Sequence, residues 1–456
     1  MPTRLPIRQH HLRLCRIGLL SVAAIVVSPA ANNGCPDRPV RSISSSATPA
    51  DVCIPDGFID VPVNYFDDYA WRAFLAMVWP AAPGHRGMAD VKKPLGAAGP
   101  LVFETLKSLW EVFHEDGSAP ASDFQTYDSA AHNACQVKPQ FGDLVLASFS
   151  GIDEIGQAGA GELAGPLAAQ NGRYVRYQTL YNQAAFDFIV RNRYYLRSAL
   201  PEVPSPRPTT PVIEFPVGSL VLKAAWLDMA GFPAEQVKRY YTRRAIVRDP
   251  GTGACSRVTV GLVGLHLVQK TASRPQWIWS SYEQIDSAPP SRFGDPVKFT
   301  FHDGGKAPMP AENPLSLAPL APEPVTPFNV ERPFFARVHP KTELTNYQYQ
   351  ELLKNTVWQY YGIVVTQWPR MEGNQALPVP ATQNGDITNT FPGAGAFSAF
   401  SNVTMETFDQ SRPQLGCMSC HNQARLPADF MWSVLDHAYP AKIAPAPAAV
   451  RNKTAQ

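Results

Sequence analysis

The chain has 456 residues, which is enough for one large domain or for two to three smaller ones. Hydrophobic residues make up 45% and charged residues 17%, a balance that excludes a disordered or fibrous protein. The formal net charge is only +2 and no basic run or stripe occurs, which argues against a nucleic-acid partner, because binding a phosphate backbone needs a basic excess.

The N-terminus has the pattern of a secretory signal peptide, which we place at residues 1–31. Arginines without any acidic residue precede an apolar run, 17–27, and small residues follow it. Such a run is too short to cross roughly 30 Å of hydrocarbon, so we expect no stable membrane span after signal cleavage. A lipid anchor at Cys35 is an alternative, although Asn32 stands where a lipid-attachment signal prefers an apolar residue. We therefore predict a periplasmic protein.

Cysteine usage fits an oxidising compartment. The cysteines that follow the signal peptide are Cys35, Cys53, Cys135, Cys255, Cys417 and Cys420. The last two belong to a motif described below, and the other four allow two disulfides in three pairings. We favour Cys35 with Cys53, because that pair closes a short loop, and Cys135 with Cys255. Four buried free thiols are the alternative.

Aromatic and aliphatic residues at helical spacing predict helices in the first half of the chain. The first helix carries the stripe from Phe66 to Met77 and is stopped by Pro80. A second covers Phe103–Phe113 and ends near Gly117, and a third covers Tyr181–Tyr195. Such stripes are typical of core packing, so we assign them no cofactor role.

Runs of β-branched and aromatic residues predict a mostly antiparallel sheet in the middle of the chain. These runs span 217–226, 240–247, 258–268 and 277–282. His266 is the one polar group within its apolar strand. A hydrogen-bonded core histidine is the ordinary interpretation of such a residue, and a metal ligand is the alternative.

Residues 305–340 contain nine prolines and little periodicity, which predicts an extended connector. Beyond it, Thr345 and Gln348 form a capping-box pattern that predicts a helix reaching Tyr361. A strand at 363–365 follows.

One motif near the C-terminus carries a specific chemistry: Cys417-Met418-Ser419-Cys420-His421. In a helical turn, positions i and i+3 lie on one face about 5 to 6 Å apart, so Cys417 and Cys420 can each add to a vinyl group of one porphyrin. His421 then projects toward the iron as the proximal ligand. A zinc half-site lacks a second ligand pair here, and a redox dithiol normally follows a strand of a βαβ unit. The motif therefore predicts one covalently bound haem c.

This motif resembles the haem-attachment signature of c-type cytochromes, which implies electron transfer through a haem iron. Three further stretches are similar to those of large, functionally uncharacterised bacterial monohaem proteins, and they span 71–74, 261–266 and 402–408. That second resemblance implies no activity. The chain departs from small cytochromes, in which the motif lies near the N-terminus and a methionine ligand follows many residues later. Only 35 residues follow His421.

The motif does not identify the residue that serves as the sixth ligand of the iron. Three residues lie close enough in sequence to reach it, namely Met405, Met431 and His437. Met431 belongs to an apolar stripe typical of core packing, and His437 lies in the last turn of a predicted helix, where a histidine is favourable without any metal. A distant residue or an open position completes the alternatives.

The sequence thus predicts an α+β fold with mixed helices, a mostly antiparallel sheet in the middle and a short helical haem-attachment segment at the C-terminus. We expect a signal peptide (1–31), an α+β body (32–304), the proline-rich connector (305–340), a haem-bearing region (341–438) and a disordered tail (439–456).

We expect this protein to exchange electrons with partner redox proteins. The sequence does not predict its oligomeric state or decide whether it is an enzyme. The alternative is a haem-dependent oxidoreductase, peroxidase-like or substrate-oxidising, that uses the large N-terminal body as a substrate domain. A haem-bearing sensor or assembly subunit is a third class. A dinucleotide fingerprint at 159–164 is rejected, because it does not directly follow a strand.

Overall fold

The structure is a computed structural model. It describes residues 34–36, 38–39, 41–43, 45–56, 63–127, 134–136, 143–147, 155–158, 165–206, 210–289, 298–316, 319–332, 338–368, 371–372, 375–376, 402–408 and 421–440. The predicted signal peptide, the 159–164 stretch and tail residues 441–456 lie outside the described residues.

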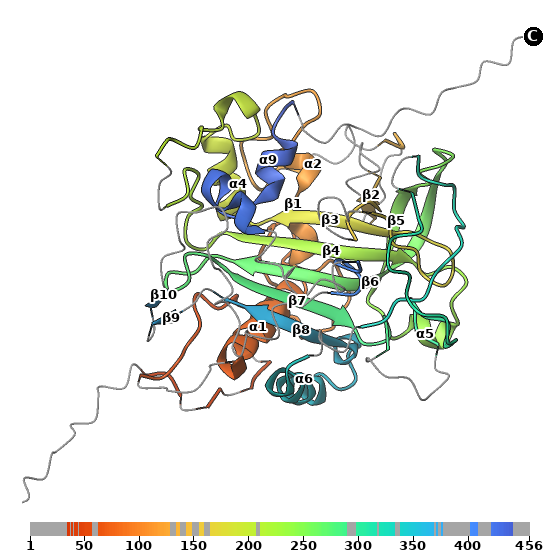
Figure 1. Cartoon of the computed structure of the whole chain (residues 1–456). Helices are drawn as coiled ribbons and strands as arrows, with labels where there is room; N and C mark the ends of the chain where they lie inside the picture. The colour runs from red at the N-terminus through yellow and green to blue at the C-terminus, as the bar shows by residue number, and fades with distance from the viewer. Residues whose placement is uncertain are drawn as a thin grey trace, which may run out of the picture.

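A curled, eight-stranded mixed sheet forms the centre of the fold (Figure 1). Its strands are β1 (Lys107–Ser108), β2 (Leu144–Leu146), β3 (Val175–Tyr181), β4 (Leu220–Asp228), β5 (Thr242–Arg248), β6 (Cys255–Gln269), β7 (Ile278–Gln284) and β8 (Tyr361–Gln367). The path runs β1-β3-β4-β6-β5-β2, and β7 joins β6 to β8. Every pairing in this sheet is antiparallel except that of β2 with β5. A separate hairpin pairs β9 (Met371–Glu372) with β10 (Gln375–Ala376).

The long strand β6 explains the curl. Its first half pairs with β5 over Cys255–Gly261, and its second half pairs with β7 over Gly264–Gln269. The opposite edge of β6 pairs with β4, with an irregularity in the register between Ala225 and Trp226. Such a bulge increases the local twist of a strand and turns its side chains.

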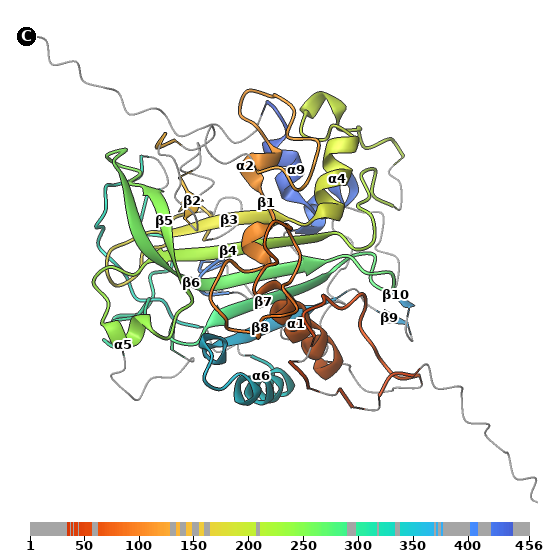
Figure 2. The ribbon, with the colours of Figure 1, turned by 180° about the vertical axis from the view of Figure 1, so that it is seen from behind.

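Two layers cover the sheet. Helix α1 (Val63–Met77) lies against one face, where the Tyr282 hydroxyl on β7 donates to the carbonyl of Ala70 at 2.6 Å. Helix α6 (Pro340–Leu352) packs beside α1, and Tyr349 stacks on Trp71. Residues 402–408 lie against the other face, where the Tyr177 hydroxyl on β3 donates to the carbonyl of Thr404. Figures 1 and 2 show the sheet from its two sides.

The remaining helices are short. They are η1 (Phe103–Thr105), α2 (Leu109–Val112), α4 (Gln183–Arg191), η3 (Arg197–Ala199), α5 (Ala234–Val237), η5 (Val357–Tyr360), η8 (Asn422–Ala424), α8 (Arg425–Ala428) and α9 (Trp432–His437). The coarse prediction of an α+β fold is therefore confirmed, as are the first helix and the four predicted strands within a few residues. The helical conformation expected at the haem-attachment cysteines concerns residues outside the described ones and stays a prediction.

The second predicted helix, Phe103–Phe113, is wrong. The chain there forms η1, β1 and α2 instead. Arg86 donates to the carbonyls of Thr105 and Leu106 at 2.7 and 2.8 Å, which are the acceptors that a continuous helix would have used. Ser108 and Glu111 then form a capping box that starts α2.

Two other helix bounds also differ from prediction. Tyr181 ends strand β3, and the third helix begins only at Gln183, where the Asn182 side chain accepts from the backbone of Ala185. Helix α6 begins at Pro340 with His339 as its N-cap, so Thr345 lies inside the helix and opens no capping box. It ends at Leu352 and does not reach Tyr361, which is the first residue of β8. Helix propensity in the sequence indicated where these helices lie, but capping contacts decide the residues at which they begin.

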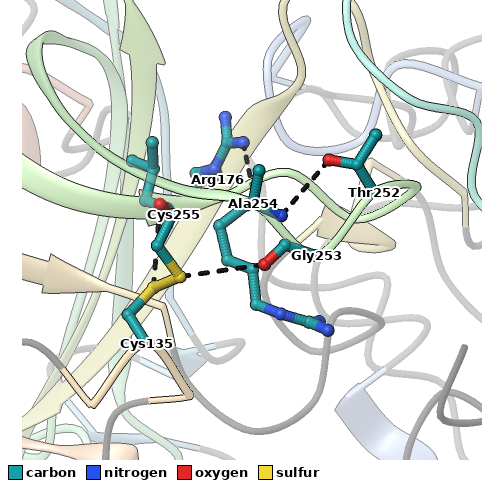
Figure 3. The surroundings of a disulfide bond; sticks show 8 residues. Cys135, Arg176, Thr252, Gly253, Ala254 and Cys255 are labelled. Atoms are coloured by element: carbon teal, nitrogen blue, oxygen red, sulfur yellow. Dashed lines mark hydrogen bonds between the residues drawn. A yellow bond between two sulfur atoms is a disulfide. The ribbon is translucent and has the colours of Figure 1, made fainter. Parts of the chain in front are cut away.

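Both favoured disulfides are present, Cys35–Cys53 and Cys135–Cys255. Figure 3 shows the second, which joins the segment before β2 to the first residue of β6 beside the turn at Thr252 and Gly253. The Cys35 sulfur is used by its disulfide, so it is not a lipid-bearing thiol in this structure. Within the described part of the chain, no helix is both long and apolar enough to cross a membrane.

Candidate haem-ligand site

His421 is the one cofactor-binding residue predicted from the motif that the structure describes. Cys417 and Cys420 lie outside the described residues. The His421 imidazole is half-buried against the indole of Trp279 on β7, with 4.5 Å between ring centroids. Its Nδ1 donates to the carbonyl oxygen of Phe430 at 2.7 Å. Because a carbonyl only accepts, this bond places the proton on Nδ1 and leaves a lone pair on Nε2.

A tight turn brings that carbonyl back to His421. Helix α8 ends at Ala428, and the next two residues, Asp429 and Phe430, have left-handed φ angles of 50° and 73°. The Asp429 carboxylate accepts from the backbone of Phe215 at 3.0 Å and pairs with Lys270 at 2.7 Å. Burial raises the pKa of Asp429 to about 6, against the lowering effect of Lys270. The turn that orients His421 is thus fixed to the end of β6.

The surroundings of His421 keep it neutral. Burial lowers its pKa to about 4, although the Phe430 carbonyl opposes this shift. Positive charge on His266 and Lys223 lowers the pKa further, and the Glu406 carboxylate raises it. A neutral imidazole with one nitrogen bonded to an acceptor is the usual form of a metal-ligating histidine. His421 therefore fits the proximal ligand of a haem iron.

Two of the groups that act on the pKa of His421, Lys223 and His266, lie on one face of the sheet. Lys223 on β4, His266 on β6 and Ser281 on β7 are directly paired in register, so their side chains share a face. Trp279 lies two residues before Ser281 and joins them. We call these four residues the His266 face. It is opposite to α1, because Tyr282, the next residue on β7, points to α1.

His266 lies beside a carboxylate. Its Nε2 is 3.3 Å from Oε1 of Glu406, and the two side chains are 17% and 21% exposed. That nitrogen is buried, and when it carries a proton it donates to the Glu406 carboxylate. The backbone N–H of Asn402 donates to the other Glu406 oxygen at 2.9 Å. Burial would raise the pKa of Glu406, but the charge of His266 and of Lys223 holds it below its ordinary value.

Residues 402–408 are held tightly on this face. The Asn402 side chain donates to the carbonyl of Tyr282 at 2.8 Å, and the Tyr177 hydroxyl donates to the carbonyl of Thr404 at 2.7 Å. Gly264 makes room for the approach: a Cβ there would lie 2.1 Å from Oγ1 of Thr404. Because Gly264 on β6 has no side chain, residues 402–408 lie close enough to β6 for Glu406 to reach His266.

The three sixth-ligand candidates from the sequence lie in other surroundings. Met405 is buried in an apolar cluster with Tyr177. Met431 is buried in the main core with Val434. The ring of His437 lies against Phe113, with 6.2 Å between centroids. All three contact hydrophobic or aromatic neighbours, which supports packing roles for them.

Sequence reasoning missed Lys223, Trp279 and Glu406. A signal existed for Lys223, which is the lone charge within the apolar run 217–226. Glu406 gave no signal of its own, because its partner is 140 positions away at His266. The two stretches that resembled monohaem proteins, 261–266 and 402–408, meet at this pair.

Among the described residues, no group of three or more histidine, cysteine or acidic side chains could hold a metal ion by itself. Axial ligation of a haem iron needs fewer protein groups than that, because the porphyrin supplies the rest.

In comparisons with protein-family models, with curated proteins and with solved structures, no match to the chain was found.

Proposed function

We propose that this protein is an exported monohaem c-type cytochrome that transfers electrons between partner redox proteins in the periplasm. The observation that carries the proposal is the state of His421. It directly follows two cysteines at haem-attachment spacing, and its neutral ring donates Nδ1–H to the Phe430 carbonyl. A bound haem would supply one-electron chemistry at its iron.

The chain's own residues have separate tasks in this proposal. Cys417 and Cys420 would hold the haem through thioethers, and His421 would bind the iron. The Phe430 carbonyl sets which nitrogen of His421 carries the proton, and the Asp429–Lys270 ion pair fixes that turn to the sheet. The Trp279 indole covers the imidazole and limits its contact with water.

Export is supported by a second, independent observation. Two disulfides are present among the described residues, and disulfides form and persist in oxidising compartments. Attachment of haem c takes place outside the cytoplasm as well, so the predicted signal peptide, the disulfides and the cysteine pair of the motif agree with one location.

The test is production of the whole chain in a bacterial host that matures c-type cytochromes. We expect the purified protein to show the α band of haem c on reduction and to gain the mass of one haem. C417S with C420S should lose covalent haem, whereas the matched control H437Q should keep it. A colourless product without the added mass would refute the proposal.

A haem-dependent oxidoreductase is the second candidate, and the His266–Glu406 pair is the observation that favours it. An imidazole next to a carboxylate can move a proton to or from a substrate near an open iron position. Ferric protein that is high-spin and binds cyanide readily would favour this candidate. Low-spin protein that resists added ligands would favour the electron carrier.

A further inference from the structure

We propose that His266 is the second axial ligand of the haem iron. This inference rests on the proposed function and assigns the coordination position that the sequence left open. The iron would then have two histidine ligands from distant parts of the chain, His266 on strand β6 and His421 in the C-terminal segment.

The first argument is position. His266 belongs to the same sheet face as Trp279, the residue that contacts the His421 ring. The electrostatic interaction of His266 with His421, which lowers the pKa of His421, agrees with this placement although 155 positions separate the two residues. A residue in the middle of a paired strand is held rigidly, which suits a ligand whose distance from a metal must be fixed.

The second argument is chemistry. Nε2 of His266 is the ring nitrogen that faces the Glu406 carboxylate, and a proton on Nε2 leaves the lone pair of the neutral ring on Nδ1, where it could bind iron. A metal-ligating histidine normally has a carboxylate or carbonyl nearby to orient it. For His421 that group is the Phe430 carbonyl, and for His266 it is the Glu406 carboxylate at 3.3 Å. The backbone of Asn402 in turn holds Glu406 in place.

The third argument is elimination among the described candidates. Met405 and Met431 are 1% and 4% exposed within apolar clusters, and moving either sulfur to an iron would open a cavity in the core. The His437 ring packs on Phe113. His266 alone combines a polar ligand atom, a carboxylate neighbour and an electrostatic effect on His421.

Two imidazole ligands have a clear consequence for function. An iron with both axial positions filled by protein is low-spin and closed to peroxide and small gases, which suits electron transfer. The haem-dependent oxidoreductase would then require His266 to leave the iron first. The assignment of His266 therefore also separates the two candidate functions.

The experiment compares the matured, haem-bearing protein with three variants by absorption and electron paramagnetic resonance spectroscopy. The wild type should be low-spin with the spectrum of two imidazole ligands. H266A should become high-spin and bind cyanide, and added imidazole should restore the low-spin spectrum. H266M should stay low-spin with the charge-transfer band of a methionine ligand. The control H437Q should match the wild type.

Two outcomes would overturn the assignment: a high-spin wild type, or an H266A spectrum unchanged from the wild type. Covalent haem is present in both outcomes. An unchanged H266A spectrum would leave the proposed electron carrier standing, whereas a high-spin wild type would favour the haem-dependent oxidoreductase. A product without haem would refute the proposed function and the ligand assignment together. Should H266A yield little protein, H266M still tests the assignment, because a wild-type spectrum in that variant excludes His266 as the ligand.

Discussion

The packing around Gly264 leaves no room for a side chain at this position. Its backbone is not left-handed, so the need arises from space: a Cβ would lie 2.1 Å from Oγ1 of Thr404 and 3.3 Å from Oδ1 of Asn402. We expect G264A to lower the free energy of unfolding by about 1 to 3 kcal/mol, the usual cost of overpacking a filled site. Urea unfolding of the purified chain measures it.

A double-mutant cycle identifies the clash. T404A removes the atom that a Cβ would meet, and by itself should cost about 1 kcal/mol for its lost hydrogen bond to Asn402. The combination of G264A with T404A should then cost less than the sum of the two single changes. Strict additivity would show that residues 402–408 do not approach β6 at this point.

The sheet was the most predictable level of structure, for a physical reason. Strands β4 and β7 and the second half of β6 are almost wholly buried and rich in aliphatic and aromatic residues, so composition marks them. Strand β3 was missed, because its sequence mixes Arg176 and Gln178 with aromatic residues. Arg176 is buried there because Glu323 pairs with it at 2.9 Å and the carbonyls of Tyr174 and Arg248 accept from its guanidinium.

Helix ends and the candidate site depended on contacts between distant segments. The helix predicted at Phe103–Phe113 is interrupted because Arg86 donates to the carbonyls of Thr105 and Leu106. The sequence around these residues has no pattern that predicts this contact. Likewise, the motif identified His421, but the Glu406–His266 pair appears only once β6 and residues 402–408 are folded together. Sequence alone therefore predicted the chemistry of the motif and missed the groups around it.

Asp67 joins three elements and makes their packing sensitive to pH. It lies on α1, fully buried, and accepts from Thr342 of α6 at 2.7 Å and from Thr366 of β8 at 2.8 Å. Burial raises its pKa from 3.8 to about 7, so the folded state binds this proton more tightly than the unfolded chain. The free energy of unfolding should therefore fall as pH rises from 4 to 8, by at most about 4 kcal/mol from this group.

D67N tests this account. An asparagine can still bond both threonines and cannot ionise, so the fall in unfolding free energy between pH 5 and pH 8 should be smaller in D67N than in the wild type. Urea unfolding at the two pH values gives the comparison. D116N is the control, because the pKa of exposed Asp116 is lowered and it does not titrate in this window. Equal slopes in D67N and the wild type would contradict the role of Asp67.

At the scale of the whole molecule, the sheet gathers segments from most of the chain. Strand β8 follows the proline-rich residues 305–340 in sequence, yet it pairs with β7 in the sheet that the preceding body forms. His421 then reaches the same sheet through Trp279. The candidate site consequently depends on long-range pairing, which is costly in chain entropy until the sheet has formed.

The two disulfides offset part of that entropy, and they should do so unequally. Their sequence separations are 18 and 120 residues for Cys35–Cys53 and Cys135–Cys255. In the chain-entropy model, closing such loops contributes roughly 3 and roughly 5 kcal/mol, because the longer loop restricts the unfolded chain more. Replacing both cysteines of one pair by serine should therefore destabilise the protein more for C135S/C255S than for C35S/C53S.

The longer bridge should also have a local effect. Cys135 precedes β2, a three-residue edge strand that pairs with β5 alone, and Cys255 begins β6 on the other side of β5. Without the bridge, β2 is held by that short parallel pairing, by the packing of Leu144 and Leu146 and by the ion pairs of Asp143. The amides in Leu144–Leu146 should therefore exchange hydrogen faster in C135S/C255S, while those of β4 should change little. Uniform acceleration across the sheet would instead show that the bridge acts on global stability alone.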